Sequence, residues 1–167
     1  MSSSVQRRFC NLAETLQAAL TLVRSDLARQ RVALSTALAL DGFEIMGDPI
    51  ELQQVLLNLL LNAAEAAREL PVERRRVMVR ARVEQEGGES VALVSVEDTG
   101  VGFDEEQIDR LFAPFYTTKP GGLGMGLSII RSIIDRHGGR IWAEANPEHG
   151  ATFHFTLPRQ TSTLVQG

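Results

Sequence analysis

The sequence predicts an α/β two-layer sandwich (α+β), in which a mixed, largely antiparallel sheet is covered on one face by three helices. Its 167 residues are enough for one domain with a two-layer core. The expected elements run in the order helix, two strands, helix, two strands, long connection, helix, two strands. Because strands come in pairs between helices, the order does not fit a doubly wound parallel sheet, which needs strict alternation of strand and helix.

Three segments have the features of helices. Residues 12–30 repeat apolar side chains at i, i+4 and i+7, which indicates an amphipathic helix. Residues 49–70 follow Asp48, an N-cap residue, and carry proline at the first helical position; Pro71 ends them. Residues 126–137 precede a glycine pair, which is typical of a helix C-terminus.

Six segments alternate or concentrate apolar residues as strands do. They are 32–40, 43–46, 77–83, 91–97, 140–145 and 152–157. A tight turn at residues 41–42 separates the first two, and turns at 86–89 and 146–150 predict two hairpins. Residues 103–124 form a long connection with one short helical piece at 105–111. A connection of this length inside a compact domain usually serves a function.

Composition excludes several classes of protein. A net charge of −4 and a pI near 5.4 argue against a nucleic-acid binder that relies on phosphate contacts. The single cysteine, Cys10, excludes an intrachain disulfide and favours a cytoplasmic location. No apolar run has the length of a membrane span. We expect a domain over residues 12–158 between flexible termini at 1–11 and 159–167.

Two glycine-rich segments indicate a nucleotide site. They are Asp98–Gly102 (DTGVG) and Gly122–Gly126 (GLGMG), and the polar, aromatic segment Phe112–Lys119 lies between them. Glycine permits positive φ and a close approach of the backbone to an anion, so that consecutive N–H groups can point at a phosphate. A single glycine pair is most often only a turn. The interpretation therefore depends on both segments together.

The second helix carries a polar stripe inside an apolar sequence. Asn58, Asn62, Glu65 and Glu69 fall on one face at 100° per residue. One interpretation is a solvent-facing stripe. The other is a ligand site, because a buried carboxamide without a partner costs about 1–3 kcal/mol. Amide oxygens suit a hard cation such as Mg²⁺. From the helix alone the two interpretations are equally supported.

In order and spacing, four segments resemble the N, G1, F and G2 boxes of sensor histidine kinases. They are residues 51–66, 98–102, 112–119 and 122–126, and the resemblance covers residues 12–158. The sequences NAAEA and TTKP are most similar to those of nitrogen- and oxygen-sensing kinases. The resemblance implies the GHKL, or Bergerat, ATP-binding fold. It also implies an ATP-dependent protein-histidine kinase domain that transfers the γ-phosphoryl group to a histidine on a separate dimerisation domain.

The resemblance implies that Asn62 coordinates Mg²⁺ and that Asn58 lies beside the phosphates. ATP-hydrolysing members of the superfamily carry a glutamate base at the Asn58 position. An amide cannot accept a proton usefully near pH 7, so this difference favours phosphotransfer over hydrolysis. Glu65 stands where many histidine kinases carry lysine, which leaves its role open. Lys119 is the implied cation for the phosphates and completes the catalytic set with the two asparagines.

By the same resemblance, Asp98 accepts from the exocyclic amine of adenine, and an ionised carboxylate suits that donor because it is acceptor-only. Thr152 is expected to join the polar network around Asp98. Phe115 belongs to a lid over the nucleotide, and the glycine loop before residue 126 offers the phosphates a helix N-terminus. The implied ATP-binding residues are Asn58, Asn62, Asp98, Gly100, Gly102, Phe115, Thr117, Thr118, Lys119, Gly122, Leu123, Gly124, Met125, Gly126 and Thr152.

None of the three histidines, His137, His149 and His154, has the sequence setting of a phosphoacceptor, and His137 is expected to cap a helix C-terminus. We therefore expect a catalytic domain from a larger sensor, monomeric when isolated. Its expected partners are the dimerisation domain and the receiver domain of a response regulator, with ATP and Mg²⁺ as cofactors. The alternatives are a GHKL ATPase that drives mechanical closure, a serine kinase of the anti-sigma-factor type, and a non-catalytic nucleotide sensor.

Overall fold

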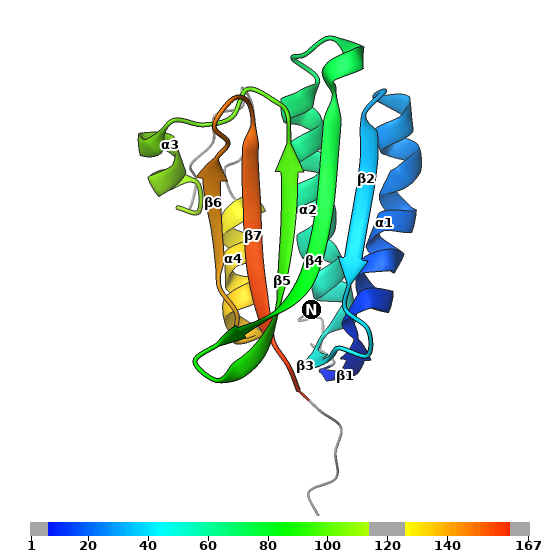
Figure 1. Cartoon of the computed structure of the whole chain (residues 1–167), viewed down its shortest axis with the longest axis vertical. Coiled ribbons are helices and arrows are strands. Elements are labelled where there is room, and N and C mark those ends of the chain that lie inside the picture. The colour runs from blue at the N-terminus through cyan, green and yellow to red at the C-terminus, as the bar shows by residue number, and fades with distance from the viewer. Residues whose placement is uncertain (1–6, 114–125, 161–167) are drawn as a thin grey trace, which may run out of the picture.

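A computed structural model describes residues 7–113 and 126–160, which form one sheet layer and one helix layer (Figure 1). The strands are β1 (Arg8–Asn11), β2 (Ala33–Ala39), β3 (Glu44–Gly47), β4 (Arg76–Glu86), β5 (Glu89–Asp98), β6 (Ile141–Ala145) and β7 (Ala151–Pro158). The helices are α1 (Leu12–Arg29), α2 (Pro49–Ala67), α3 (Glu105–Arg110) and α4 (Gly126–Arg136), with a 3₁₀ turn, η1 (Val72–Arg74).

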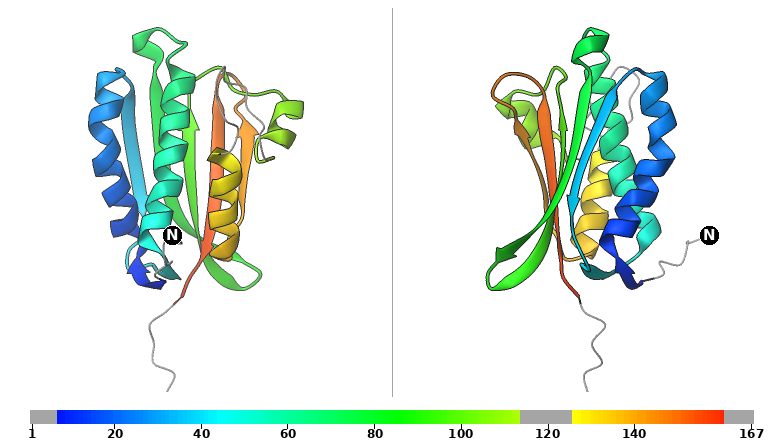
Figure 2. Two further views of the ribbon diagram at one scale, coloured as in Figure 1. Left: turned by 180° about the vertical axis from the view of Figure 1, so that it is seen from behind. Right: turned by 45° about the vertical axis from the view of Figure 1, so that its right-hand side comes forward.

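The main sheet has the strand order β2-β4-β5-β7-β6. β2 and β4 are parallel, and the other three pairs are antiparallel. Helices α1, α2 and α4 lie side by side on one face, and the other face is open (Figures 1 and 2). The predicted mixed, largely antiparallel sheet under three helices is therefore confirmed.

The start of the domain differs from the expectation. β1 pairs antiparallel with β3 in a separate two-stranded sheet, so the prediction of a flexible segment over residues 1–11 is wrong for residues 8–11. β2 and β3 flank the turn at residues 41–42 but do not pair with each other. The physical reason is that β1 supplies hydrogen-bond partners for β3, and the Leu12 N–H donates to the Phe43 carbonyl at 3.0 Å as α1 begins.

The core lies between the sheet and the apolar faces of α1 and α2. Leu16 and Leu20 of α1 and Leu56 and Leu60 of α2 are fully buried, and they belong to one cluster with Val94 of β5. Burying a leucine side chain contributes about 1.5–3 kcal/mol. These faces fix α2 along the sheet and so fix every side chain that α2 carries toward its C-terminus.

Asp48 and His137 set the relative direction of α2 and α4. Asp48 caps α2 as predicted, since its Oδ1 accepts from the Ile50 N–H at 2.9 Å. The Asp48 N–H donates to Nε2 of His137 at 3.0 Å, and Nδ1 of that ring contacts the Ile133 carbonyl at 2.8 Å. The ring therefore carries its proton on Nδ1. His137 follows the last turn of α4, so α4 runs antiparallel to α2.

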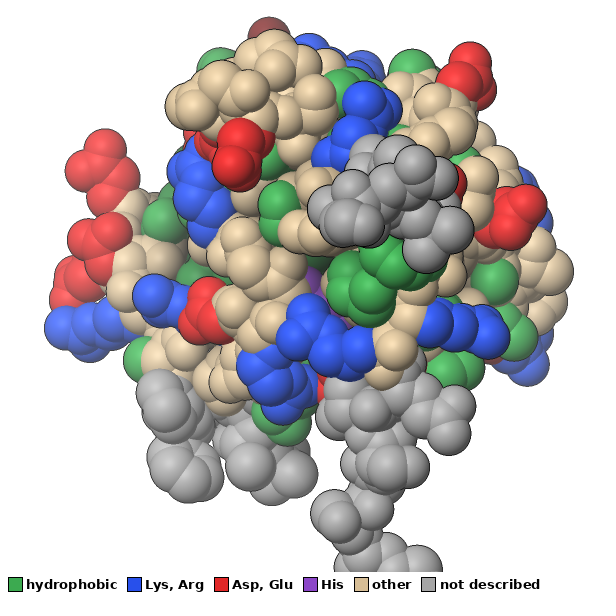
Figure 3. All heavy atoms as spheres, turned by 90° about the horizontal axis from the view of Figure 1, so that it is seen from below, with side chains coloured by type: hydrophobic (Ala, Val, Ile, Leu, Met, Phe, Trp, Pro, Cys, Tyr) green, Lys and Arg blue, Asp and Glu red, His purple; other side chains and the backbone are tan. Residues whose placement is uncertain are grey.

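Arginines brace the two ends of the helix layer. The Arg75 guanidinium donates to the carbonyls of Leu70, Gln30 and Arg68 and so holds the C-terminal ends of α1 and α2 together. At the opposite end, Arg7 donates to the carbonyl of Arg136. In the view from below, basic side chains gather near the middle of the face (Figure 3).

Candidate functional site

Asp98 is the last residue of β5 and is only 3% exposed. Its Oδ1 accepts from the Gly100 N–H at 2.9 Å and from the Ala151 N–H at 3.3 Å. Among the described residues, Oδ2 has no hydrogen-bond partner, and it is not a buried unsatisfied atom. One oxygen thus fixes the carboxyl group while the other is available to a donor from outside the protein.

Burial raises the pKa of Asp98 from 3.8 to about 6. The hydrogen bonds from Gly100 and Ala151 act in the opposite direction, and the negative charge of Glu97 adds a smaller upward shift. A buried carboxylate with a raised pKa gains from any donor that satisfies its charged form. The electrostatics of Asp98 therefore favour a ligand that offers an N–H group.

Three glycines allow α2, the end of β5 and the β6–β7 turn to meet around this carboxylate. A Cβ on Gly100 would lie 2.5 Å from the Ala66 carbonyl oxygen of α2. Gly102 has φ +70, and a Cβ there would lie 2.7 Å from the Gly150 carbonyl oxygen. Gly150 has φ +87, and its Cβ would lie 2.0 Å from the carbonyl oxygen of Asp98. Only glycine fits such approaches without movement of the backbone.

The two asparagines lie on α2 before this meeting point. Asn58 and Asn62 are both half-buried, and Ala66, against which Gly100 packs, is one helical turn beyond Asn62. α4 spans ten residue steps, or about 15 Å at the usual helical rise. α4 is antiparallel to α2, and its C-terminal end lies beside Asp48. Its N-terminal residue, Gly126, therefore lies at about the level of the asparagines.

Gly126 is exposed, and a Cβ built on it would meet nothing within 4 Å. The N-terminal residue of α4 therefore lies at the surface of the domain. In the described residues, the Asp98 turn packs against the C-terminal part of α2 through Gly100 and Ala66.

Thr152 contacts the Asp98 region only indirectly. Its strand register pairs it with Glu97, so its side chain projects from the face of the sheet opposite to Asp98. The Thr152 hydroxyl donates to Oδ1 of Asn146 at 2.6 Å, and Nδ2 of Asn146 donates to the Asp98 carbonyl at 3.2 Å. The expected polar network exists, but it passes through Asn146, a residue that sequence reasoning placed only in a turn.

Part of the predicted site lies outside the described residues. These positions are Phe115, Thr117, Thr118, Lys119, Gly122, Leu123, Gly124 and Met125. Just before them, Phe112 is half-buried and packs edge-on against Phe153, with ring centroids 6.1 Å apart. Phe112 thus anchors the start of the connection to the sheet.

The described side chains include no group of three or more His, Cys, Asp or Glu residues that would hold a metal by themselves. A cation here would need oxygen ligands from amides and from a bound nucleotide. The amide oxygens of Asn58 and Asn62 fit Mg²⁺, which prefers hard oxygen donors and commonly shares them with phosphates. Over the same residues, no helix is long and apolar enough to cross a membrane.

Comparison with known proteins gives a consistent result. Residues 47–161 match the family described as histidine kinase-, DNA gyrase B-, and HSP90-like ATPase. The sensor protein FixL of Bradyrhizobium diazoefficiens is 40% identical over 92% of the chain, and the match spans 29% of FixL. The chain thus spans less than a third of the length of this curated relative.

Solved structures with this fold include the nucleotide-free catalytic domain of the histidine kinase ThkA. It is 32% identical, with a TM-score of 0.75 over 92% of this chain and 96% of that domain. ThkA in complex with the response regulator protein TrrA is also similar, with 29% identity and a TM-score of 0.73 over 93% of this chain and 42% of that one.

Proposed function

The chain belongs to the family of histidine kinase-, DNA gyrase B- and HSP90-like ATPases and is a sensor histidine kinase catalytic domain. We propose that it transfers the γ-phosphoryl group of ATP to a histidine on a separate dimerisation domain. The observation that carries the proposal is the buried Asp98 carboxylate at the junction of α2, β5 and the β6–β7 turn, with one oxygen left for a ligand.

Asp98 selects the base. Its second oxygen accepts from the exocyclic amine of adenine, and a carboxylate offers no donor to the carbonyl that guanine carries at that position. Gly100 and Gly102 let the backbone pack against Ala66 and Gly150, where a side chain would clash, and this packing fixes the turn that carries Asp98. Adenine recognition is thus built on backbone packing around one charged group.

The phosphates extend from the base toward the middle of α2. Asn58 and Asn62 face them, the first amides of α4 at Gly126 offer N–H donors, and Lys119 supplies the positive charge. Bound Mg²⁺, held through Asn62, would offset the negative charge of the phosphate oxygens. The protein's own contribution is positioning and charge neutralisation, which is what phosphoryl transfer requires.

The acceptor is a histidine and not water. Asn58 stands where a glutamate base would activate water, and an amide does not take up a proton near pH 7. In the transfer, the bond between the γ-phosphorus and the β,γ-bridging oxygen breaks, a phosphorus–nitrogen bond forms on the imidazole, and ADP leaves. Two of the domain's own histidines are engaged elsewhere: both ring nitrogens of His137 form hydrogen bonds, and Nδ1 of His154 contacts Ser95 Oγ at 2.7 Å.

We place the domain in the cytoplasm, as a monomer when isolated, with two partners. The first is the histidine-bearing dimerisation domain, and the second is the receiver domain of a response regulator. The second partner is supported by ThkA, which is similar to this chain and has been solved in complex with a response regulator.

The test is a transfer assay with γ-labelled ATP, Mg²⁺ and the histidine-bearing dimerisation domain of a parent sensor. We expect label on the dimerisation domain that is lost in acid and retained in base, and no label when its histidine is replaced by alanine. Release of labelled phosphate without transfer would favour an ATPase, and acid-stable phosphoserine on a partner would favour a serine kinase. Either result would contradict the proposal.

A further inference from the structure

The main chain of Asp98 is held by a side chain from another element. Asp98 lies one residue beyond the last pair of the β5–β7 ladder, Glu97 with Thr152. Its carbonyl oxygen instead accepts from Nδ2 of Asn146, which lies in the turn between β6 and β7, at 3.2 Å. The carboxyl group and the carbonyl of Asp98 are therefore fixed by separate partners.

Asn146 is itself fixed at both ends. Its N–H donates to the Gly150 carbonyl at 3.0 Å and closes the turn. Its Oδ1 accepts from the hydroxyl of Thr152 at 2.6 Å, and Thr152 is only 8% exposed. The hydroxyl sets the orientation of the carboxamide, so that the amino group and not the oxygen points at Asp98.

Only a carboxamide of this length makes both contacts. An aspartate at position 146 would place a second oxygen against the Asp98 carbonyl and lose the donor. A valine at position 152 would keep the shape of threonine and remove the hydroxyl. The network thus depends on two particular functional groups, one in the turn and one in β7.

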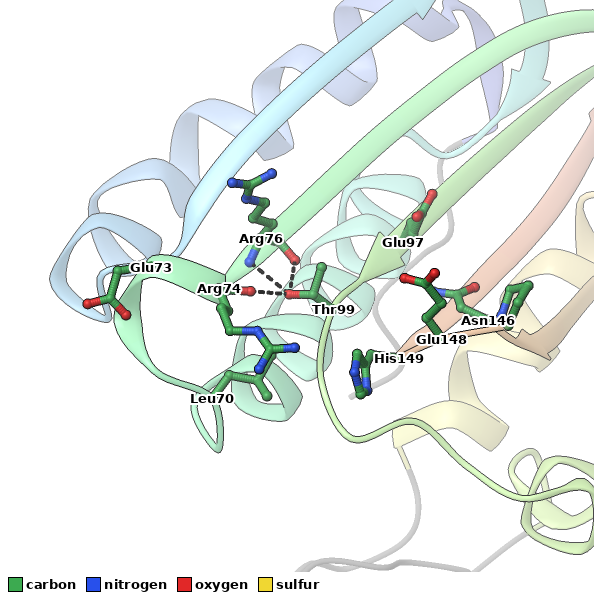
Figure 4. Close-up of a pocket in the computed structure, with 10 residues that line it drawn as sticks. Leu70, Glu73, Arg74, Arg76, Glu97, Thr99, Asn146, Glu148 and His149 are labelled. Atoms are coloured by element: carbon green, nitrogen blue, oxygen red, sulfur yellow. Dashed lines mark hydrogen bonds between the residues drawn. The ribbon is translucent and has the colours of Figure 1, made fainter.

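This network lies on the far side of the sheet from the ligand-facing oxygen of Asp98. Figure 4 shows Asn146 at the wall of a hollow on that side, together with Glu97 and Thr99, the two neighbours of Asp98. The Thr99 hydroxyl accepts a hydrogen bond from the Arg76 N–H and donates one to the Arg74 carbonyl. Asn146 therefore does not touch the nucleotide, and any effect it has on binding acts through the backbone of Asp98.

We propose that Asn146, oriented by Thr152, is a positioning residue for adenine recognition. It holds the backbone of Asp98 from the opposite side of the sheet, so that Oδ2 points at the amine of the base. This inference rests on the proposed function, because it requires ATP as the ligand of Asp98. It adds a determinant of base specificity that makes no contact with the base.

The experiment measures the binding of two ligands to the isolated domain by calorimetry. The ligands are ATP and purine riboside triphosphate, which has the same phosphates and ring system but lacks the 6-amino group. The variants are Asn146→Asp and Thr152→Val, with Thr152→Ser as the matched control that keeps the hydroxyl. Melting temperature confirms that each variant is folded, and Thr152→Val tests the network if Asn146→Asp does not fold.

We expect wild type and Thr152→Ser to prefer ATP over the deamino ligand by about tenfold or more, as a hydrogen bond to a charged acceptor gives. Asn146→Asp and Thr152→Val should reduce that preference by about fivefold to tenfold. The added charge of Asn146→Asp repels both triphosphates alike, so it cancels in the ratio.

Three outcomes would overturn the inference in distinguishable ways. If both variants bind each ligand with wild-type affinity, Asn146 does not position Asp98, and the proposed function stands. If both ligands weaken equally, Asn146 has only a general structural role. If wild type itself shows no preference for ATP, Asp98 does not read the base, and the proposed nucleotide site fails together with the inference.

Discussion

Replacing Asp98 by asparagine should change stability and ATP binding in opposite directions. In the folded domain the pKa of Asp98 is raised from 3.8 to about 6, mainly by burial, so folding favours the protonated carboxyl group. Below about pH 4 both the folded and the unfolded chain hold that proton, and the titration of Asp98 does not lower the free energy of unfolding. As the pH rises from about 4 to about 6, the unfolded chain releases the proton first, and stability falls.

A difference of about 2 pKa units corresponds to about 3 kcal/mol of unfolding free energy, taken as an order of magnitude. Asparagine carries no charge at any pH, keeps an oxygen for the N–H groups of Gly100 and Ala151, and removes this loss. Relative to wild type, Asp98→Asn should therefore gain stability progressively between pH 4 and pH 7. The other carboxyl groups titrate in both proteins and cancel in the comparison.

ATP binding should respond with the opposite sign. At pH 7 the variant places a donor opposite the adenine amine, which costs about 1–3 kcal/mol, or about tenfold to a hundredfold in affinity. Urea denaturation at pH 4, 5, 6 and 7 gives the stability difference, and calorimetry gives the affinity. A stability difference that stays flat across this pH range, or unchanged ATP affinity in the folded variant, would refute the reasoning.

Three further substitutions test other parts of the site. Gly100→Ala places a Cβ 2.5 Å from the Ala66 carbonyl oxygen and should lower unfolding free energy by about 1–3 kcal/mol and weaken ATP binding; unchanged urea midpoints and affinity would contradict this. His137→Phe leaves the buried Asp48 N–H without its acceptor and should also cost about 1–3 kcal/mol, so an unchanged melting temperature would count against it. Asn58→Glu supplies a carboxylate base and should raise steady-state phosphate release, whereas a rate equal to wild type would argue against the role assigned to the amide.

Much of the fold was predictable because its signals are local. Asp48 followed by proline marks the start of α2, and the structure places the cap there. The turns at residues 86–89 and 146–150 join the antiparallel pairs β4–β5 and β6–β7, as predicted. Each of these features depends on neighbours within four residues, which is the range that sequence patterns describe best.

The missed features depend on contacts between distant segments. β1 is four residues long and becomes a strand only because β3 lies beside it, so the pattern of residues 8–11 does not predict a strand. In the candidate site, Asn146 in a turn looks like an ordinary turn residue. Its role follows from a contact with Asp98, 48 residues away, and the sequence contains no signal for that pairing.

The most direct test of the central claim is the titration of Asp98 itself, followed by the NMR signal of its carboxyl carbon in the free domain and in the presence of an ATP analogue. We expect a pKa of about 6 without nucleotide, because the carboxylate is buried and, within residues 7–113 and 126–160, only one of its oxygens has hydrogen-bond partners. With the analogue, the adenine amine stabilises the charged form, and the pKa should fall. A guanine analogue at the same concentration should leave the titration unchanged. An Asp98 titration that is the same with and without the ATP analogue would contradict the account.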